Sequence, residues 1–162
     1  MDETALEQNY VTMLYDRLDQ LRSQAAERLE VYLRQTGGTP QARSERDAAT
    51  TRYTDQLAQY SAVESGLCFG RLDFDDGGRT YIGRLGIFDE DGDYDPLLID
   101  WRAPAARPFY LATAASPEGV ARRRHIRTRL RTVVGLDDEV LDLDAAAHTG
   151  NHGLDDGGLT GE

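Results

Sequence analysis

The feature that most constrains the fold is an apolar stripe that starts near the N-terminus and keeps helical spacing. Its members lie three or four residues apart: Tyr10, Leu14, Leu18, Leu21, Ala25, Leu29 and Tyr32. This spacing places all of them on one helix face and predicts a helix from about Glu3 to Gln35. The stripe is narrow, which is typical of a seam between two helices.

A strong turn signal follows this stripe in the sequence Thr36-Gly37-Gly38-Thr39-Pro40. Gly37 can adopt the left-handed conformation that ends a helix. Thr39 can cap the next helix, and Pro40 suits its first position because no N–H is needed there. A second helical pattern then contains Ala49, Tyr53, Leu57, Tyr60 and Val63. Because the connection is short, residues 1–66 are predicted to form an antiparallel helical hairpin, a coiled coil.

Residues 67–143 have frequent Gly and Pro and are predicted to form a small antiparallel β-domain. Three apolar runs are separated by Asp- and Gly-rich turn clusters: Leu67–Phe74, Thr80–Phe88 and Pro96–Arg102. Such turns favour hairpins in a meander. Two further strands are expected at His125–Val134 and Glu139–Leu143, with Asp137-Asp138 between them. The segment 103–115 is ambiguous, with a short helical turn after Pro108 as one interpretation.

Residues 144–162 carry four acidic residues, no basic residue and almost nothing to bury. This composition predicts a flexible, disordered acidic tail. The fold class expected from the whole sequence is therefore α+β, with an N-terminal helical hairpin, a β-domain and a tail.

Composition excludes several functions. All 18 basic residues are Arg, so no lysine is present for a phosphate-binding loop, a Schiff base or a Ser-Lys dyad. Cys68 is the only cysteine, which excludes an internal disulfide and a Cys-based zinc site. No nucleophile lies beside a base in the sequence. These observations favour a binding module over an enzyme, with no cofactor or metal of its own.

The net charge is -11, which argues against an autonomous nucleic-acid-binding protein. No apolar run approaches the ~18 residues of a membrane helix, and the acidic N-terminus lacks a signal-peptide pattern. We therefore expect a soluble cytoplasmic protein without a membrane partner.

One cationic segment stands against this acidic background, at residues 122–131. In a strand, five of its side chains share one face: Arg123, His125, Arg127, Arg129 and Arg131. Such a face can bind phosphates or an acidic protein surface. The alternative, which we favour slightly, is an internal ladder of ion pairs with the acidic hairpin turns.

The segment Asp100-Trp101-Arg102 contains the only tryptophan of the chain. The simplest interpretation is a buried Trp101 whose indole N–H has a partner, next to an internal Asp100–Arg102 pair.

Several stretches together resemble a known family. They are Gly37–Gln41, Arg43–Asp47, Cys68–Asp73, Tyr81–Gly86, Leu98–Pro104, Arg123–Arg129 and Asp138–Asp142. The sequence resembles the N-terminal region of actinobacterial HelD-type RNA polymerase-recycling ATPases, which are relatives of the UvrD/Rep helicases. The Asp100–Pro104 stretch is the most specific part of this resemblance, which covers nearly the whole chain.

The resemblance implies that the hairpin enters the secondary channel of RNA polymerase and helps to release or recycle the enzyme. The expected contact residues lie at its tip: Thr36, Gly37, Gly38, Thr39, Pro40 and Arg43. Transcript-cleavage factors hold magnesium with carboxylates at such a tip, whereas Thr36–Pro40 has none. The resemblance also implies that ATP and magnesium belong to downstream ATPase domains, a further partner of this chain.

Two alternatives stay open from the sequence. The chain can be a nucleic-acid-binding accessory domain of a UvrD/Rep-like DNA helicase that uses the Arg122–Arg131 stripe. It can also be an oligomerisation coiled coil.

Overall fold

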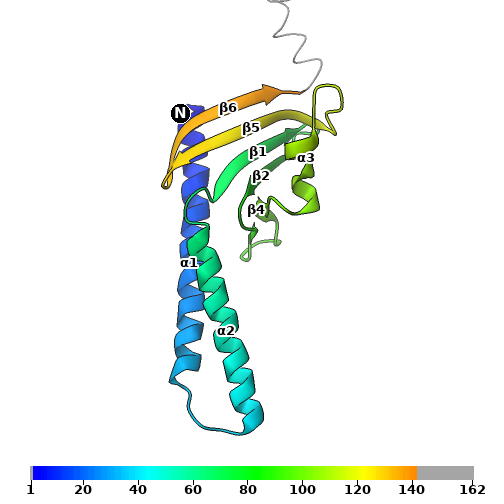
Figure 1. The fold of residues 1–162 in the computed structure, drawn as a ribbon. Coiled ribbons are helices and arrows are strands. Elements are labelled where there is room, and N and C mark those ends of the chain that lie inside the picture. The colour runs from blue at the N-terminus through cyan, green and yellow to red at the C-terminus, as the bar shows by residue number, and fades with distance from the viewer. Residues whose placement is uncertain (1, 142–162) are drawn as a thin grey trace, which may run out of the picture. The chain divides into compact units, whose positions relative to one another are not determined.

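The chain forms two compact units in a computed structural model that describes residues 2–141 (Figure 1). Among these residues, one unit comprises those through Leu67 together with Thr128–Val133, and the other comprises Cys68–Arg127 together with those from Val134 onward. The predicted acidic tail, residues 144–162, lies outside the described residues.

The first unit is built on two long helices, α1 (Glu3–Arg34) and α2 (Pro40–Ala62), which lie side by side (Figure 1). Local signals start both helices. The Asp2 carboxylate accepts a hydrogen bond from the Ala5 N–H at 2.7 Å, and the Thr39 hydroxyl accepts one from the Ala42 N–H at 3.1 Å. The two long helices predicted from the sequence are confirmed, while the coiled-coil character of their packing stays a prediction.

Burial along this helical pair is uneven. The buried positions of α1 cluster in its N-terminal half, and α2 has no buried residue: the buried set is Glu7, Val11, Leu14, Tyr15, Leu18 and Ala25. Toward the connection, the rings of Tyr32 and Tyr53 stack with their centroids 5.9 Å apart. The apolar seam is therefore thin in the half of the pair that carries the connection.

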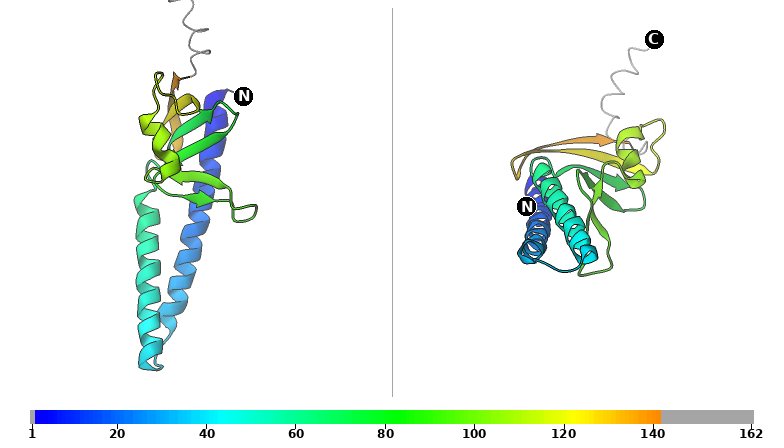
Figure 2. Two further views of the ribbon diagram at one scale, coloured as in Figure 1. Left: turned by 90° about the vertical axis from the view of Figure 1, so that its right-hand side faces the viewer. Right: turned by 60° about the horizontal axis from the view of Figure 1, so that its bottom comes forward.

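The second unit contains most of a six-stranded sheet with a short helical segment on one face (Figure 2). Its strands are β1 (Cys68–Phe74), β2 (Arg79–Gly83), β3 (Ile87–Phe88), β4 (Pro96–Asp100), β5 (Val120–Arg129) and β6 (Thr132–Val140). The spatial order is β3-β4-β2-β1-β5-β6. A 3₁₀ turn, η1 (Pro104–Ala106), leads into the short helix α3 (Arg107–Leu111), in the segment that the sequence left ambiguous.

The all-antiparallel meander expected from the sequence is wrong at one pair of strands. The predicted strand Thr80–Phe88 divides into β2 and β3, and β4 lies between them, parallel to β2 and antiparallel to β3. Gly83 and Gly86 flank the break. Glycine has no side chain to pack on the pleated surface, so the chain can leave the sheet there.

The turn between the last two strands was also misplaced. The sequence placed it at Asp137-Asp138, whereas it lies at Leu130-Arg131 and Leu130 has a φ of +55°. Asp137 and Asp138 belong to β6 because each pairs with an arginine of the neighbouring strand, which favours the strand over the turn.

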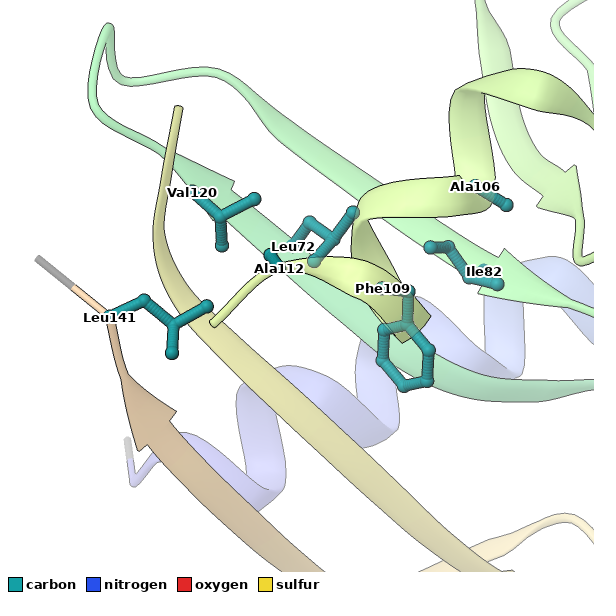
Figure 3. Close-up of a cluster of buried hydrophobic side chains, with 7 residues drawn as sticks. All are labelled: Leu72, Ile82, Ala106, Phe109, Ala112, Val120 and Leu141. Carbon is teal, nitrogen blue, oxygen red and sulfur yellow. The ribbon is translucent and has the colours of Figure 1, made fainter. Parts of the chain in front are cut away.

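The core of the second unit lies between α3 and the sheet (Figure 3). Its buried members are Leu72, Ile82, Ala106, Phe109, Ala112, Val120 and Leu141. Gly70 makes room for the central ring, since a Cβ at that position would lie 2.3 Å from a ring carbon of Phe109. This core fixes α3, and with it the side chains on the outer surface of α3.

Candidate functional site

The connection between α1 and α2 presents the first candidate surface. The six predicted contact residues, Thr36 to Pro40 and Arg43, are all exposed. The backbone reverses through Gly37 and Gly38, whose φ angles of +73° and +95° are in the region that favours glycine. The Arg46 guanidinium donates a hydrogen bond to the Gly37 carbonyl oxygen at 2.9 Å and steadies this reversal. The structure therefore brings the predicted tip residues together on one exposed turn.

Chemically, this tip is apolar and cationic. Val31 and Leu33, in the last turn of α1, are more than half exposed. Arg43 is exposed and has no ion-pair partner among residues 2–141. The flanking acids are engaged, because Glu30 pairs with Arg34 and Glu45 accepts a hydrogen bond from Gln41. The turn itself, Thr36–Pro40, contains no carboxylate.

The arginines of β5 form the second candidate surface, and most of their charge is neutralised within the sheet. The Arg123 guanidinium lies 2.6 Å from Glu139 and donates to the carbonyl oxygens of Phe109 and Ala112, both at 2.9 Å. Arg127 pairs with Asp137 at 2.9 Å. These contacts favour the interpretation of the cationic segment as an internal ladder of ion pairs.

Arg131 lies in the β5–β6 turn and, like Arg129, belongs to the first unit. Its guanidinium pairs with Asp19 of α1 and with Glu64, both at 2.8 Å, and lies 4.7 Å from the centre of the Tyr15 ring. The hydrogen bonds from Arg131 lower the pKa values of Asp19 and Glu64, and the same bonds raise the pKa of Arg131. Arg131 therefore links α1 to the segment that follows α2. We call this region, at the end of α2 away from the α1–α2 connection, the base of the helical pair.

His125 and Arg129 complete the predicted set. The exposed His125 imidazole lies 5.0 Å from the Phe109 ring, centre to centre. Arg129 is exposed and forms no ion pair within the described part of the chain. Of the four arginines predicted to share a cationic face, Arg129 is thus the one without a carboxylate partner among the described residues.

Sequence reasoning did not single out the two most buried cations among the described residues, which lie on the opposite face of the sheet. Arg71 is 4% exposed and Arg124 is 1% exposed. Arg71 pairs with Asp73 at 2.9 Å, and Arg124 binds both carboxylate oxygens of Asp138, at 2.6 and 2.8 Å. Arg122 and Arg124 alternate along the strand with the residues of the predicted cationic face. This alternation is the sequence signal that places arginines on the opposite face.

These contacts also set the acidity of the carboxyl groups. Burial raises the pKa of Asp73, but hydrogen bonds from Arg71 and Arg122 outweigh it and the net pKa is lowered. The hydrogen bond from Arg124 lowers the pKa of Asp138.

The expectation that Trp101 is buried is wrong, because its side chain is 47% exposed. The expected ion pair between Asp100 and Arg102 is confirmed, and the turn that it closes accounts for the exposure of Trp101. The Asp100 carboxylate accepts hydrogen bonds from the Arg102 N–H at 2.9 Å and from the Arg102 guanidinium at 2.7 Å, and these bonds lower its pKa. This short turn at the end of β4 leaves the indole outside, where its ring meets the edge of Tyr110 at 6.4 Å.

None of the helices in the described part of the chain is long and apolar enough to cross a membrane. Within residues 2–141, no three His, Cys, Asp or Glu side chains gather as a metal site would require.

Fold and surfaces together define an α+β domain with a long helical pair, a tip without carboxylates and a sheet reinforced by internal ion pairs. The sequence matches the family described as the N-terminal domain of DNA helicase IV HelD over residues 4–152. The chain therefore belongs to this family of helicase N-terminal domains. No curated protein matches the chain.

Proposed function

We propose that this chain is the RNA polymerase-binding domain of a HelD-type helicase. In this proposal α1 and α2 form an antiparallel coiled coil over residues 1–66 that enters the polymerase secondary channel. Insertion there helps to release or recycle polymerase in the cytoplasm. Catalysis, with ATP and magnesium, belongs to ATPase domains downstream and not to this chain.

The observation that carries the proposal is the chemistry of the tip. A narrow channel admits a slender pair of helices, and the seam of this pair is thin near the connection. The exposed Val31 and Leu33 supply apolar contact, and Arg43 supplies a charge that no described side chain neutralises. Because carboxylates are absent from Thr36–Pro40, the tip fits occupation of the channel and not transcript cleavage.

The alternative, a nucleic-acid-binding accessory domain, is weakened by the ion pairs of β5 and of the β5–β6 turn. Arg123, Arg127 and Arg131 all bind carboxylates of the same chain. A phosphate would have to displace these partners, and nucleic-acid affinity depends on cations that remain available.

The test is an insertion of four Gly/Ser residues between Gly37 and Gly38, assayed by pull-down with the RNA polymerase of the cell that encodes the chain. A channel is sterically intolerant, so we expect the insertion to weaken binding at least about tenfold, equivalent to ~1.4 kcal/mol. The matched control is the same insertion between Gly77 and Gly78, in the exposed β1–β2 turn, which should bind like the unmodified chain.

Two outcomes contradict the proposal. Unchanged polymerase binding by the Gly37–Gly38 insertion would show that the tip is not a channel probe. Loss of single-stranded DNA binding in Arg129→Ala, with no polymerase binding by any variant, would favour the accessory-domain alternative.

A further inference from the structure

The outer surface of α3 carries an exposed aromatic cluster that neither the core nor the proposed polymerase contact uses. Trp101 is 47% exposed, Tyr110 is 50% exposed and Leu111 is 51% exposed. Trp101 and Tyr110 touch edge to face, and Tyr110 in turn meets the buried Phe109 ring at 5.3 Å. The cluster is therefore held in place by the core beneath it.

Charge borders this cluster on two sides. The Arg102 guanidinium lies 6.0 Å from the Trp101 ring centre and is held by Asp100. Arg107 precedes Tyr110 by three residues and Leu111 by four, so the three share one face of α3. Arg107 is exposed and pairs with no acid in the described chain.

This composition is that of a protein-binding hot spot. Trp, Tyr and Arg dominate the energetics of protein interfaces, and a rigid aromatic pair loses little conformational entropy on binding. A nucleic acid is a poorer occupant, because the chain carries a net charge of -11 and most of its sheet arginines are already paired.

The route of the chain indicates which protein surface can reach the cluster. Leu141, the last described residue, is buried beside Ala112 and Val120, next to the end of α3 (Figure 3). Its N–H donates a hydrogen bond to the Ala121 carbonyl oxygen at 2.8 Å. The last described residue of the chain therefore lies in the same core that holds α3. A domain tethered there is at high effective concentration near the cluster.

We propose that Trp101, Tyr110, Leu111 and Arg107, here called the α3 platform, bind the domain that follows this one in the same helicase polypeptide. The complementary surface is an apolar recess with a carboxylate opposite Arg107. The inference rests on the chain being the N-terminal domain of a larger helicase, and it does not depend on polymerase binding.

The test is photo-crosslinking in the full-length helicase with p-benzoylphenylalanine in place of Tyr110. We expect cross-links to peptides beyond residue 162 of the same polypeptide. A mixture of ¹⁴N- and ¹⁵N-labelled protein distinguishes them from links between two copies. The matched control is p-benzoylphenylalanine in place of Tyr94, an aromatic residue that is also exposed but lies in the β3–β4 turn, where no such cross-links are expected.

Two further variants, Trp101→Ala and Arg107→Glu, should each lower the cross-link yield at position 110 at least about tenfold, as expected for hot-spot residues. Circular dichroism checks that both remain folded. Cross-links only between copies, only to an added DNA oligonucleotide, or to no protein would each overturn the proposal. A cross-link yield unaffected by both variants would overturn it as well. None of these results would bear on the polymerase pull-down.

Discussion

The two units use their buried side chains in different ways. In the sheet unit a compact set of apolar side chains, centred on Phe109, is almost completely buried. In the helical unit α2 buries none of its residues, and burial in α1 thins out beyond Leu18. The sheet unit is therefore stabilised by a core. The end of the helical pair that carries the tip depends on helix capping and on partly exposed contacts, and so remains available for a partner.

Charges follow the same division. Arg71 and Arg124 are buried in the sheet unit with carboxylate partners, so each is costly to disturb. In the helical unit the main ionic contacts, around Arg131, lie at the base, and the contacts near the tip are exposed pairs such as Glu30–Arg34. Exposed pairs of this kind contribute little, typically less than ~1 kcal/mol.

The largest effect should come from the centre of the sheet core. Phe109→Ala should lower the free energy of unfolding by ~3–5 kcal/mol, because it leaves a cavity under α3. Its neighbour Tyr110→Ala, half exposed, serves as the control and should cost less than ~1 kcal/mol. Urea denaturation followed by circular dichroism measures both. Equal losses would contradict the division between a packed core and an open platform.

Within the helical unit, α1 and α2 should respond unequally. Leu18→Ala should cost ~2–4 kcal/mol, because Leu18 is fully buried. Leu57→Ala, the matched change in α2, should cost only ~1 kcal/mol, because that side chain is partly exposed in a helix without buried residues. Thermal melting at matched concentration separates the two, and a larger loss for Leu57→Ala would reverse the burial argument.

The base of the helical pair should be sensitive to acid. The pKa values of Asp19 and Glu64 are lowered by Arg131, so their stabilising contribution is complete above the unfolded-state pKa values near ~4 and is lost as the pH falls below them. Arg131→Met should cost ~1 kcal/mol at pH 7 and flatten this acid dependence.

The measurement for the base is the unfolding midpoint of unmodified chain and Arg131→Met between pH 2 and pH 7. Arg34→Met, at an exposed pair, is the control and should leave the pH profile unchanged. If the pH profile of Arg131→Met parallels that of the unmodified chain, the ion pairs of Arg131 with Asp19 and Glu64 do not cause the acid sensitivity.

The smallest effect on stability should come from the tip. The four-residue insertion between Gly37 and Gly38 should change the free energy of unfolding by less than ~0.6 kcal/mol, because loop-closure entropy grows slowly with loop length. Differential scanning calorimetry measures it. A loss as large as that of Leu18→Ala would show that the connection itself holds the helices together.

Elements fixed by local signals could be predicted from the sequence, and those fixed by distant contacts could not. Thr39 and Pro40 gave the start of α2 because capping depends only on neighbouring residues. The sequence misplaced the β5–β6 turn because Leu130 at positive φ carries no turn signal. No feature of the sequence near β4 indicates that this strand pairs in parallel with β2.

The candidate surfaces follow the same rule. The tip could be located because it coincides with a turn signal. The neutralisation of Arg123 and Arg127 depends on partners in β6, and the exposure of Trp101 depends on the Asp100–Arg102 turn. Alternation along one strand shows which side chains share a face, but not what lies opposite them.

The membership of Thr128–Val133 in the helical unit has a consequence for how this gene can be recombined. A breakpoint placed after Leu67 would transfer the two helices to a new host protein without the turn that carries Arg131, and so without the partner of Asp19 and Glu64. A chimaera that exchanges the helical arm between relatives must therefore carry two separate coding blocks. Compatible residues at 19, 64 and 131 would have to be inherited together.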